Sequence, residues 1–239
     1  MEQLSLISIL GLGFVLGLKH AVDADHLAAV ATLTSERRSL LSSLFIGVLW
    51  GVGHTISLMM AGILVIFLHL QITELLKQSL EFVVAIMLVA LGANALRKLA
   101  RGGHVHMHVH EHGGHMHAHP HVHGNNTPDP ANTHHELHSG LRPLIIGGVH
   151  GLAGSAALIL LVLTTISSAI EALLYIALFG LGSIGGMMIL STLLALPARL
   201  TVQRFSRVNL AVRCTAAVLS LSLGVLMIYQ IGFVNHLLL

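Results

Sequence analysis

Long apolar stretches recur along the chain and are separated by short polar or basic segments. Each stretch is long enough for a membrane-spanning helix, which needs about 20 residues to cross a hydrocarbon core of about 30 Å. The predicted spans are residues 4–33, 40–70, 79–97, 143–168, 170–197 and 208–235. We therefore expect an all-α, polytopic membrane protein with six transmembrane helices.

The composition supports membrane insertion. Hydrophobic residues make up 54% of the 239 residues and charged residues only 9%, and the mean hydropathy is +0.84. A soluble globule of this size needs more polar surface. The start Met1-Glu2-Gln3 has no basic segment of a signal peptide, so we expect the first span to be retained. The single cysteine, Cys214, excludes an internal disulfide and a multi-cysteine metal site.

Most basic residues fall on one side of the predicted membrane. They are Arg37, Arg38, Arg97, Lys98, Arg101, Arg142, Arg199, Arg204 and Arg207. The opposite side has only Lys77. By the positive-inside rule, we expect the long central loop in the cytoplasm and both termini outside the cytoplasmic membrane. No basic patch with interleaved aromatic residues occurs, so no nucleic-acid partner is expected.

The two halves of the chain match each other at an offset of about 130 residues. The matching segments are Leu49–His54 with Leu178–Ser183, His20-Ala21 with His150-Gly151, and Leu91-Gly92 with Leu223-Gly224. Three matches in register indicate a duplicated three-helix unit, although Gly-rich apolar helices also resemble one another by composition alone. We predict two inverted repeats, residues 1–99 and 143–239, because three spans per unit reverse the second unit. Secondary transporters often have this architecture, with the substrate site at the repeat interface.

Histidines and aspartates cluster inside the first predicted span, next to Lys19. Ionisable side chains at this depth are costly and usually mark a path for an ion or substrate. On an ideal helix, His20, Asp23 and His26 form a ridge about 9 Å long, on which the two histidines would struggle to share one ion. Either the helix is distorted here, or the second span contributes a ligand, most obviously His54.

Asp25 lies on another face of the ideal helix, and we expect it to orient a ligating imidazole. The predicted metal ligands are His20, Asp23, Asp25, His26 and His54. Imidazole and carboxylate ligands without thiolate favour nickel, cobalt, zinc or copper(II) over magnesium and calcium. Elsewhere, Glu81, Asn94 and Glu171 lie near predicted span ends and are interpreted as interfacial residues.

A histidine-rich tract lies within residues 100–142, where histidines alternate with small or apolar residues. These are His104, His106, His108, His110, His112, His115, His117, His119, His121 and His123. Such a tract cannot bury a core, so we expect disorder without metal. Neutral imidazoles bind borderline transition metals, which predicts an accessory site that collects, buffers or hands over ions. The alternative is a spacer with incidental histidines.

The segment His20-Ala-Val-Asp-Ala-Asp-His26 has the form H-x4-D-H and resembles the signature of the nickel/cobalt transporter family of permeases. In that family the motif lies on a membrane helix, and its histidines and aspartate are needed for metal recognition. The resemblance implies this role for His20, Asp25 and His26. The stretch Gly51-Val-Gly-His54-Thr55 resembles the next family motif. Six spans and a polar central loop are similar to the shorter, UreH-like branch of urease-accessory permeases.

The second half departs from the family pattern. Family motifs there carry acidic residues, whereas residues 147–155 and 179–186 carry none. His150 and Ser155 are the candidate contributors from this half. His150 is interpreted equally well as a second ligand or as an interfacial residue that faces lipid headgroups.

The sequence predicts a secondary permease that imports Ni²⁺, with Co²⁺ as an open alternative, and it contains no G-x-x-x-x-G-K-[ST] motif for ATP. Export of the same ions stays open, as does a membrane-embedded zinc hydrolase. No base or oxyanion-stabilising group can be assigned for such an enzyme, so we expect a non-enzyme. No resident cofactor is expected, because the metal is the substrate. The expected partners are the ion, the lipid bilayer, and a cytoplasmic nickel chaperone or a urease or hydrogenase maturation protein.

Overall fold

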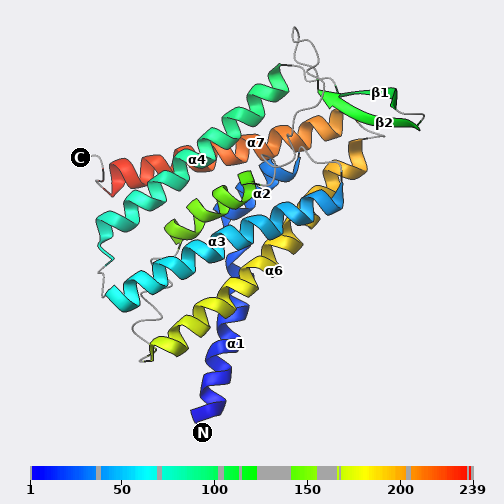
Figure 1. The fold of residues 1–239 in the computed structure, drawn as a ribbon. Helices are drawn as coiled ribbons and strands as arrows, with labels where there is room; N and C mark the ends of the chain where they lie inside the picture. The colour runs from blue at the N-terminus through cyan, green and yellow to red at the C-terminus, as the bar shows by residue number, and fades with distance from the viewer. Residues whose placement is uncertain are drawn as a thin grey trace.

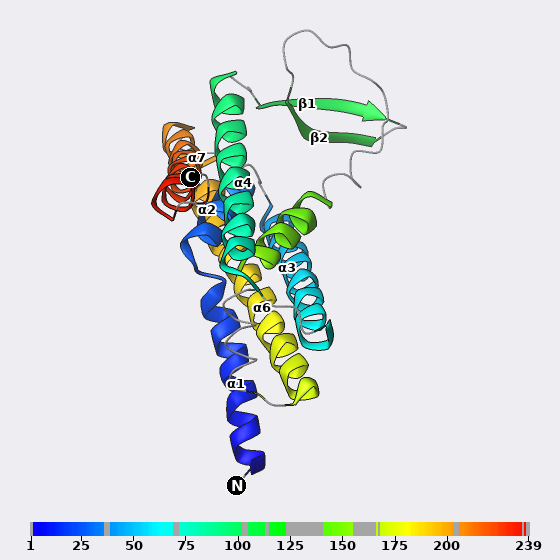
Figure 2. The same ribbon diagram turned by 90° about the vertical axis from the view of Figure 1, so that its left-hand side faces the viewer.

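The computed structural model describes residues 2–35, 39–68, 72–101, 105–112, 115–122, 141–154, 166, 168–202, 206–235 and 237. Its labelled helices are α1 (Glu2–His20), α2 (Ala24–Ser35), α3 (Leu40–Leu68), α4 (Glu74–Ala100), α6 (Ala169–Val202) and α7 (Ser206–Tyr229). A π-helical turn, η1 (Gln230–Val234), continues α7, and residues 141–154 form a further helix. Figure 1 shows α3 beside α6 and α4 beside α7, an arrangement that Figure 2 repeats from the side.

Several of the described helices are long and apolar enough to cross a membrane. Four qualify singly, namely Leu40–Leu68, Glu74–Ala100, Ala169–Pro197 and Arg207–Val234, and the bent pair Ile7–His20 and Ala24–Ser35 makes a fifth if it is one span. The predicted span at 143–168 is helical through residue 154, and most of its remainder lies outside the described residues. The helical membrane-protein class is therefore confirmed, with up to five spans within the described part of the chain.

Much of each span faces outward with apolar side chains. Only 28% to 50% of the most apolar stretch of each single span is buried inside the molecule. Large side chains such as Leu41, Phe45, Ile63 and Leu226 are exposed along the helices. Exposed apolar surface of this extent is unfavourable in water and is favourable in contact with lipid chains.

The first span is not the single helix that the sequence predicts for residues 4–33. The chain stops being helical after His20, makes a turn through Ala21-Val22-Asp23, and begins α2 at Ala24 with a bend of 55°. At the turn, the Val22 N–H donates to the Lys19 carbonyl and the Asp23 N–H donates to the His20 carbonyl, at 3.0 and 3.1 Å. The physical reason is local, because polar side chains such as aspartate compete with the helical backbone for hydrogen bonds.

Glycines bring the helices into close contact with one another. At eight of the described positions a Cβ atom would collide with a backbone carbonyl of a neighbouring helix, so a larger residue would force the helices apart. The glycines and the carbonyls that they meet are Gly17 with Phe179, Gly147 with Trp50, Gly53 with Leu144, Gly182 with Phe14, Gly92 with Ala217, Gly224 with Ala85, Gly47 with Met187 and Gly151 with His54. Packing by small residues is the usual basis of helix association in membranes.

The histidine-rich tract contains two strands where the sequence analysis expects disorder. β1 (Val105–His112) and β2 (His115–Val122) form an antiparallel hairpin beyond one end of the helices (Figure 2). The register places histidine opposite histidine at every second pair: His106 and His121, His108 and His119, His110 and His117, and His112 and His115. The alternation of histidine with other residues has the two-residue period of a strand, which accounts for the difference. His104 and His123 lie outside the described residues.

We predict that Gly53→Ala destabilises the protein, whereas Gly11→Ala does not. A Cβ at Gly53 would collide with the Leu144 carbonyl, whereas one at Gly11 would meet nothing within 4 Å. Overpacking of this kind costs about 1–3 kcal/mol. The measurement is the thermal midpoint of the purified protein in detergent, by size-exclusion chromatography after heating. Equal midpoints for the two variants would contradict this account of the packing.

Candidate metal site

The break after His20 brings the two motif histidines together. The imidazole centroids of His20 and His26 are 4.5 Å apart, and the ring of His54 from α3 lies 5.2 Å from His20 and 5.4 Å from His26. One nitrogen of each ring lies within 4.8 Å of the other two. Both routes that the sequence analysis left open occur together, since the helix is distorted and α3 contributes His54.

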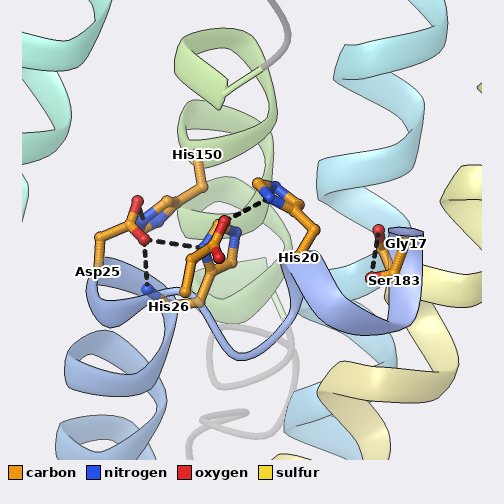
Figure 3. A network of polar contacts seen from close by, with 7 residues as sticks. Gly17, His20, Asp25, His26, His150 and Ser183 are labelled. Carbon is orange, nitrogen blue, oxygen red and sulfur yellow. Dashed lines mark hydrogen bonds and ion pairs between the residues drawn. The ribbon is translucent and has the colours of Figure 1, made fainter. Parts of the chain in front are cut away.

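A second group of converging side chains shares His26 with the first. Nδ1 of His26 lies 3.1 Å from one carboxylate oxygen of Asp25, and Nε2 of His150 lies 3.2 Å from the other oxygen. Figure 3 shows Asp25 between these two rings. The side chain of His150 is only 1% exposed, and its ring lies 4.6 Å from that of His26. His150 thus faces the interior of the molecule instead of the lipid headgroups.

The hydrogen bonds leave several ring nitrogens without a partner. An ionised carboxylate can only accept, so His26 and His150 donate to Asp25, and His20 donates from Nδ1 to Asp23 at 2.7 Å. Nε2 of His26, Nδ1 of His150 and both ring nitrogens of His54 are buried without a hydrogen-bond partner in the described part of the chain. Buried polar atoms are nearly always satisfied, so these nitrogens are candidate ligand atoms for a metal ion.

The other predicted site residues take different places. Asp23 is outside both groups, and its half-exposed side chain pairs with His20, which orients the ring. Asp25 accepts from the backbone N–H of His26 at 2.9 Å as well as from two imidazoles, which matches the orienting role expected of it. Ser155 lies outside the described residues, so its predicted contribution stays a prediction.

The surrounding helices hold the histidines in place through small residues and hydroxyls. Ser183 of α6 donates to the Gly17 carbonyl of α1 at 3.3 Å, as drawn in Figure 3, and this bond lies one turn before His20. Thr55, next to His54, donates to the Gly180 carbonyl of α6 at 3.2 Å. α6 therefore contacts the residues beside both His20 and His54, and ties α1 to α3.

A cleft of about 490 Å³ reaches His20 of the site. His20, Asp23 and Asp25 line one side of this cleft, and Glu81 of α4 also lines it. The sequence analysis interpreted Glu81 as interfacial and missed this position. The position of Glu81 along α4 does not predict a place in the cleft. The face of α4 that turns toward the first span is set by the packing of α4 against α2 and α7.

The arrangement suits a borderline transition metal. The ligand atoms of the first group are all imidazole nitrogens, and the second group adds one carboxylate. Imidazole-rich sites favour ions such as Ni²⁺, Co²⁺, Cu²⁺ and Zn²⁺, whereas Mg²⁺ and Ca²⁺ prefer oxygen. A carboxylate that accepts from two imidazoles fixes their orientation, as partners of metal-ligating histidines commonly do.

The chain is 38% identical over 237 residues to the urease accessory protein UreH of Bacillus sp. (strain TB-90), and the match covers 99% of this chain and 97% of that protein. The chain belongs to the UreH family. This confirms the resemblance to the UreH-like branch that rests on the motifs around His20 and His54. UreH is an accessory protein, as its name states, and the expectation of a non-enzyme agrees with membership of this family. No family model matches the chain, and no solved structure matches it.

We predict that Asp25→Asn weakens nickel binding by about 10-fold to 100-fold, the usual cost of losing an orienting partner of a ligating histidine. An amide cannot accept from both imidazoles with the strength of a carboxylate. The measurement is isothermal titration of the purified protein with NiCl₂, in a background that lacks residues 103–139 so that the loop histidines do not contribute. Glu171→Gln is the matched control. Equal affinities for Asp25→Asn and the background protein would contradict the role of Asp25.

Proposed function

We propose that this UreH-family protein is a secondary permease that imports Ni²⁺ across the cytoplasmic membrane, with Co²⁺ as a second substrate. The observation that carries the proposal is the convergence of His20, His26 and His54 at the break of a membrane helix. Nε2 of His26 and both ring nitrogens of His54 have no hydrogen-bond partner among the described residues. Membership of a family of urease accessory proteins supports a nickel substrate.

The two ligand groups suggest how the ion moves through the protein. His26 belongs to both groups, with His20 and His54 on one side and Asp25 and His150 on the other. An ion that passes between the two groups, in either direction, exchanges two ligands and keeps His26. Shared ligands lower the cost of such a transfer, because the ion is never without a donor.

Reciprocal packing supports two inverted three-helix repeats, residues 1–99 and 143–239. Gly53 meets the carbonyl of Leu144, and Gly182 meets the carbonyl of Phe14, so each glycine and each carbonyl has its counterpart 129 or 130 residues away. Gly17 and Gly147 form a second such pair, because Gly17 meets the carbonyl of Phe179 and Gly147 meets that of Trp50. Gly92 and Gly224 form a third, because Gly92 meets the carbonyl of Ala217 and Gly224 meets that of Ala85. Two halves related by a pseudo-two-fold axis are expected to make such pairs of equivalent contacts. Inverted repeats of this kind underlie alternating access in many transporters.

Basic residues at helix ends support the orientation. Arg97 and Arg101 lie at the end of α4, Arg142 lies at the start of the helix 141–154, and Arg207 lies at the start of α7. The positive-inside rule then places this end, with the histidine-rich loop of residues 100–142, in the cytoplasm and both termini outside. The loop would receive ions there and pass them to a cytoplasmic nickel chaperone or a urease or hydrogenase maturation protein.

We predict that His54→Ala reduces the accumulation of radiolabelled nickel in intact cells to the level of cells with empty vector. His54 supplies ring nitrogens to the first ligand group and is 1% exposed, so no other side chain can take its place. His106→Ala is the matched control and should leave uptake near the wild-type level, because His106 lies in β1, in the hairpin beyond one end of the helices.

Protein levels are measured in parallel from a C-terminal epitope. Wild-type accumulation in His54→Ala cells would overturn the site. Accumulation below that of the empty vector in wild-type cells would show export instead of import.

We predict that deletion of residues 103–139 lowers the number of nickel ions bound per chain without abolishing uptake. The register of β1 and β2 places histidines opposite each other in four pairs, and each pair can supply two ligands to one ion. The number of bound ions is measured by equilibrium dialysis of the full-length and deleted proteins. Complete loss of uptake in the deleted protein would contradict an accessory role for the loop.

A further inference from the structure

The cleft that reaches the histidines is lined by charged side chains from both of its walls. Lys19, Asp23 and Asp25 come from the broken first span, whereas Glu81 comes from α4. Three carboxylates therefore face one ammonium group, so the lining carries a net negative charge. A narrow cleft of one sign of charge raises the local concentration of ions of the opposite sign.

Glu81 is an unusual residue for its place in α4. It lies within the span Glu74–Ala100, seven residues from the start of the helix, which is about 10 Å along the helix axis. Among the described residues it has neither a hydrogen bond nor an ion pair, whereas Glu74 on the same helix pairs with Lys77. A carboxylate at such a depth is costly and usually marks an ion path.

Exposure falls steadily from the mouth of the cleft to the site. The side chains of Asp23, Asp25 and His20 are 51%, 28% and 18% exposed, and those of His26 and His54 are 1% exposed. The carboxylates are thus more exposed than the imidazoles, and His20 lines the cleft in front of the buried His26 and His54. A hydrated Ni²⁺ ion can bind carboxylates through its water shell, whereas binding to imidazoles requires the loss of water.

We propose that Glu81 of α4 and Asp23 of the broken first span, which both line the cleft, form a capture site that binds the hydrated divalent cation before it reaches the buried histidines. The capture site rests on the permease proposed above and adds a first step to it. Because electrostatics and water-mediated contacts dominate there, the site attracts divalent cations in general, and selection for nickel occurs afterwards at His20, His26 and His54.

The first test is the nickel dependence of uptake by Glu81→Gln. We expect the KM for Ni²⁺ to rise about 10-fold, in keeping with the effect of a charged cleft on local ion concentration, while Vmax changes little. Glu81→Asp keeps the charge and should keep KM near that of the wild type. Glu74→Gln, on the same helix but outside the cleft, is the matched control.

A KM for Glu81→Gln within two-fold of the wild-type value would overturn the capture site. A lower Vmax at unchanged KM would assign Glu81 a structural role and would also overturn it. Either result leaves the permease intact if His54→Ala still abolishes uptake. The two proposals can therefore fail separately.

The second test measures cation binding in the cleft independently of transport. Met227 of α7 lines the same cleft, so Met227→Cys in a Cys214→Ser background offers a thiol next to Glu81. In intact cells, Ni²⁺ should slow modification of this thiol by a membrane-impermeant, cationic methanethiosulfonate. The protecting Ni²⁺ concentration should rise about 10-fold when Glu81→Gln is added, and should be unchanged by His54→Ala. Protection that is lost with His54→Ala but is kept with Glu81→Gln would overturn the capture site.

Discussion

The pairing of one aspartate with two imidazoles holds the centre of this molecule together. Asp25 lies at the start of α2 inside a membrane span, where an unpaired carboxylate would be very costly. His26 and His150 both donate to it, and they come from opposite halves of the chain. The same carboxylate accepts from the backbone at the first turn of α2. This one group therefore fixes the positions of His26 and His150 beside the break in the first span.

Close helix packing makes that arrangement possible. The histidines can converge only if neighbouring helices approach each other at backbone distance. Gly17 permits this between α1 and α6, and Gly53 and Gly151 permit it between α3 and the helix 141–154. Gly151 meets the carbonyl of His54 itself, directly after His150. The apolar packing of the helices and the polar chemistry of the site therefore meet at the same residues.

Much of the site could be predicted from the sequence, and the remainder required three-dimensional packing. The motif around His20 and His26 and its partner His54 were predicted from residue type and spacing, because ionisable residues in apolar segments are conspicuous. The place of His150 stayed ambiguous, since spacing within one helix does not say which face meets another helix. The same limitation hid the position of Glu81 in the cleft. For the hairpin, composition predicts disorder whereas the two-residue period of the histidines predicts strands, and the structure follows the period.

The proposed duplication preserved packing and changed charge. Counterpart positions keep glycine in both halves, as in Gly53 and Gly182, because any larger residue would separate the helices. The acidic residues of the cleft have no such counterparts: at the corresponding offsets of 130 and 132 residues, Asp23 matches Ala153 and Glu81 matches Arg213. The negative charge of the cleft is therefore a feature of the first half of the chain, whereas the close packing at glycine is common to both halves.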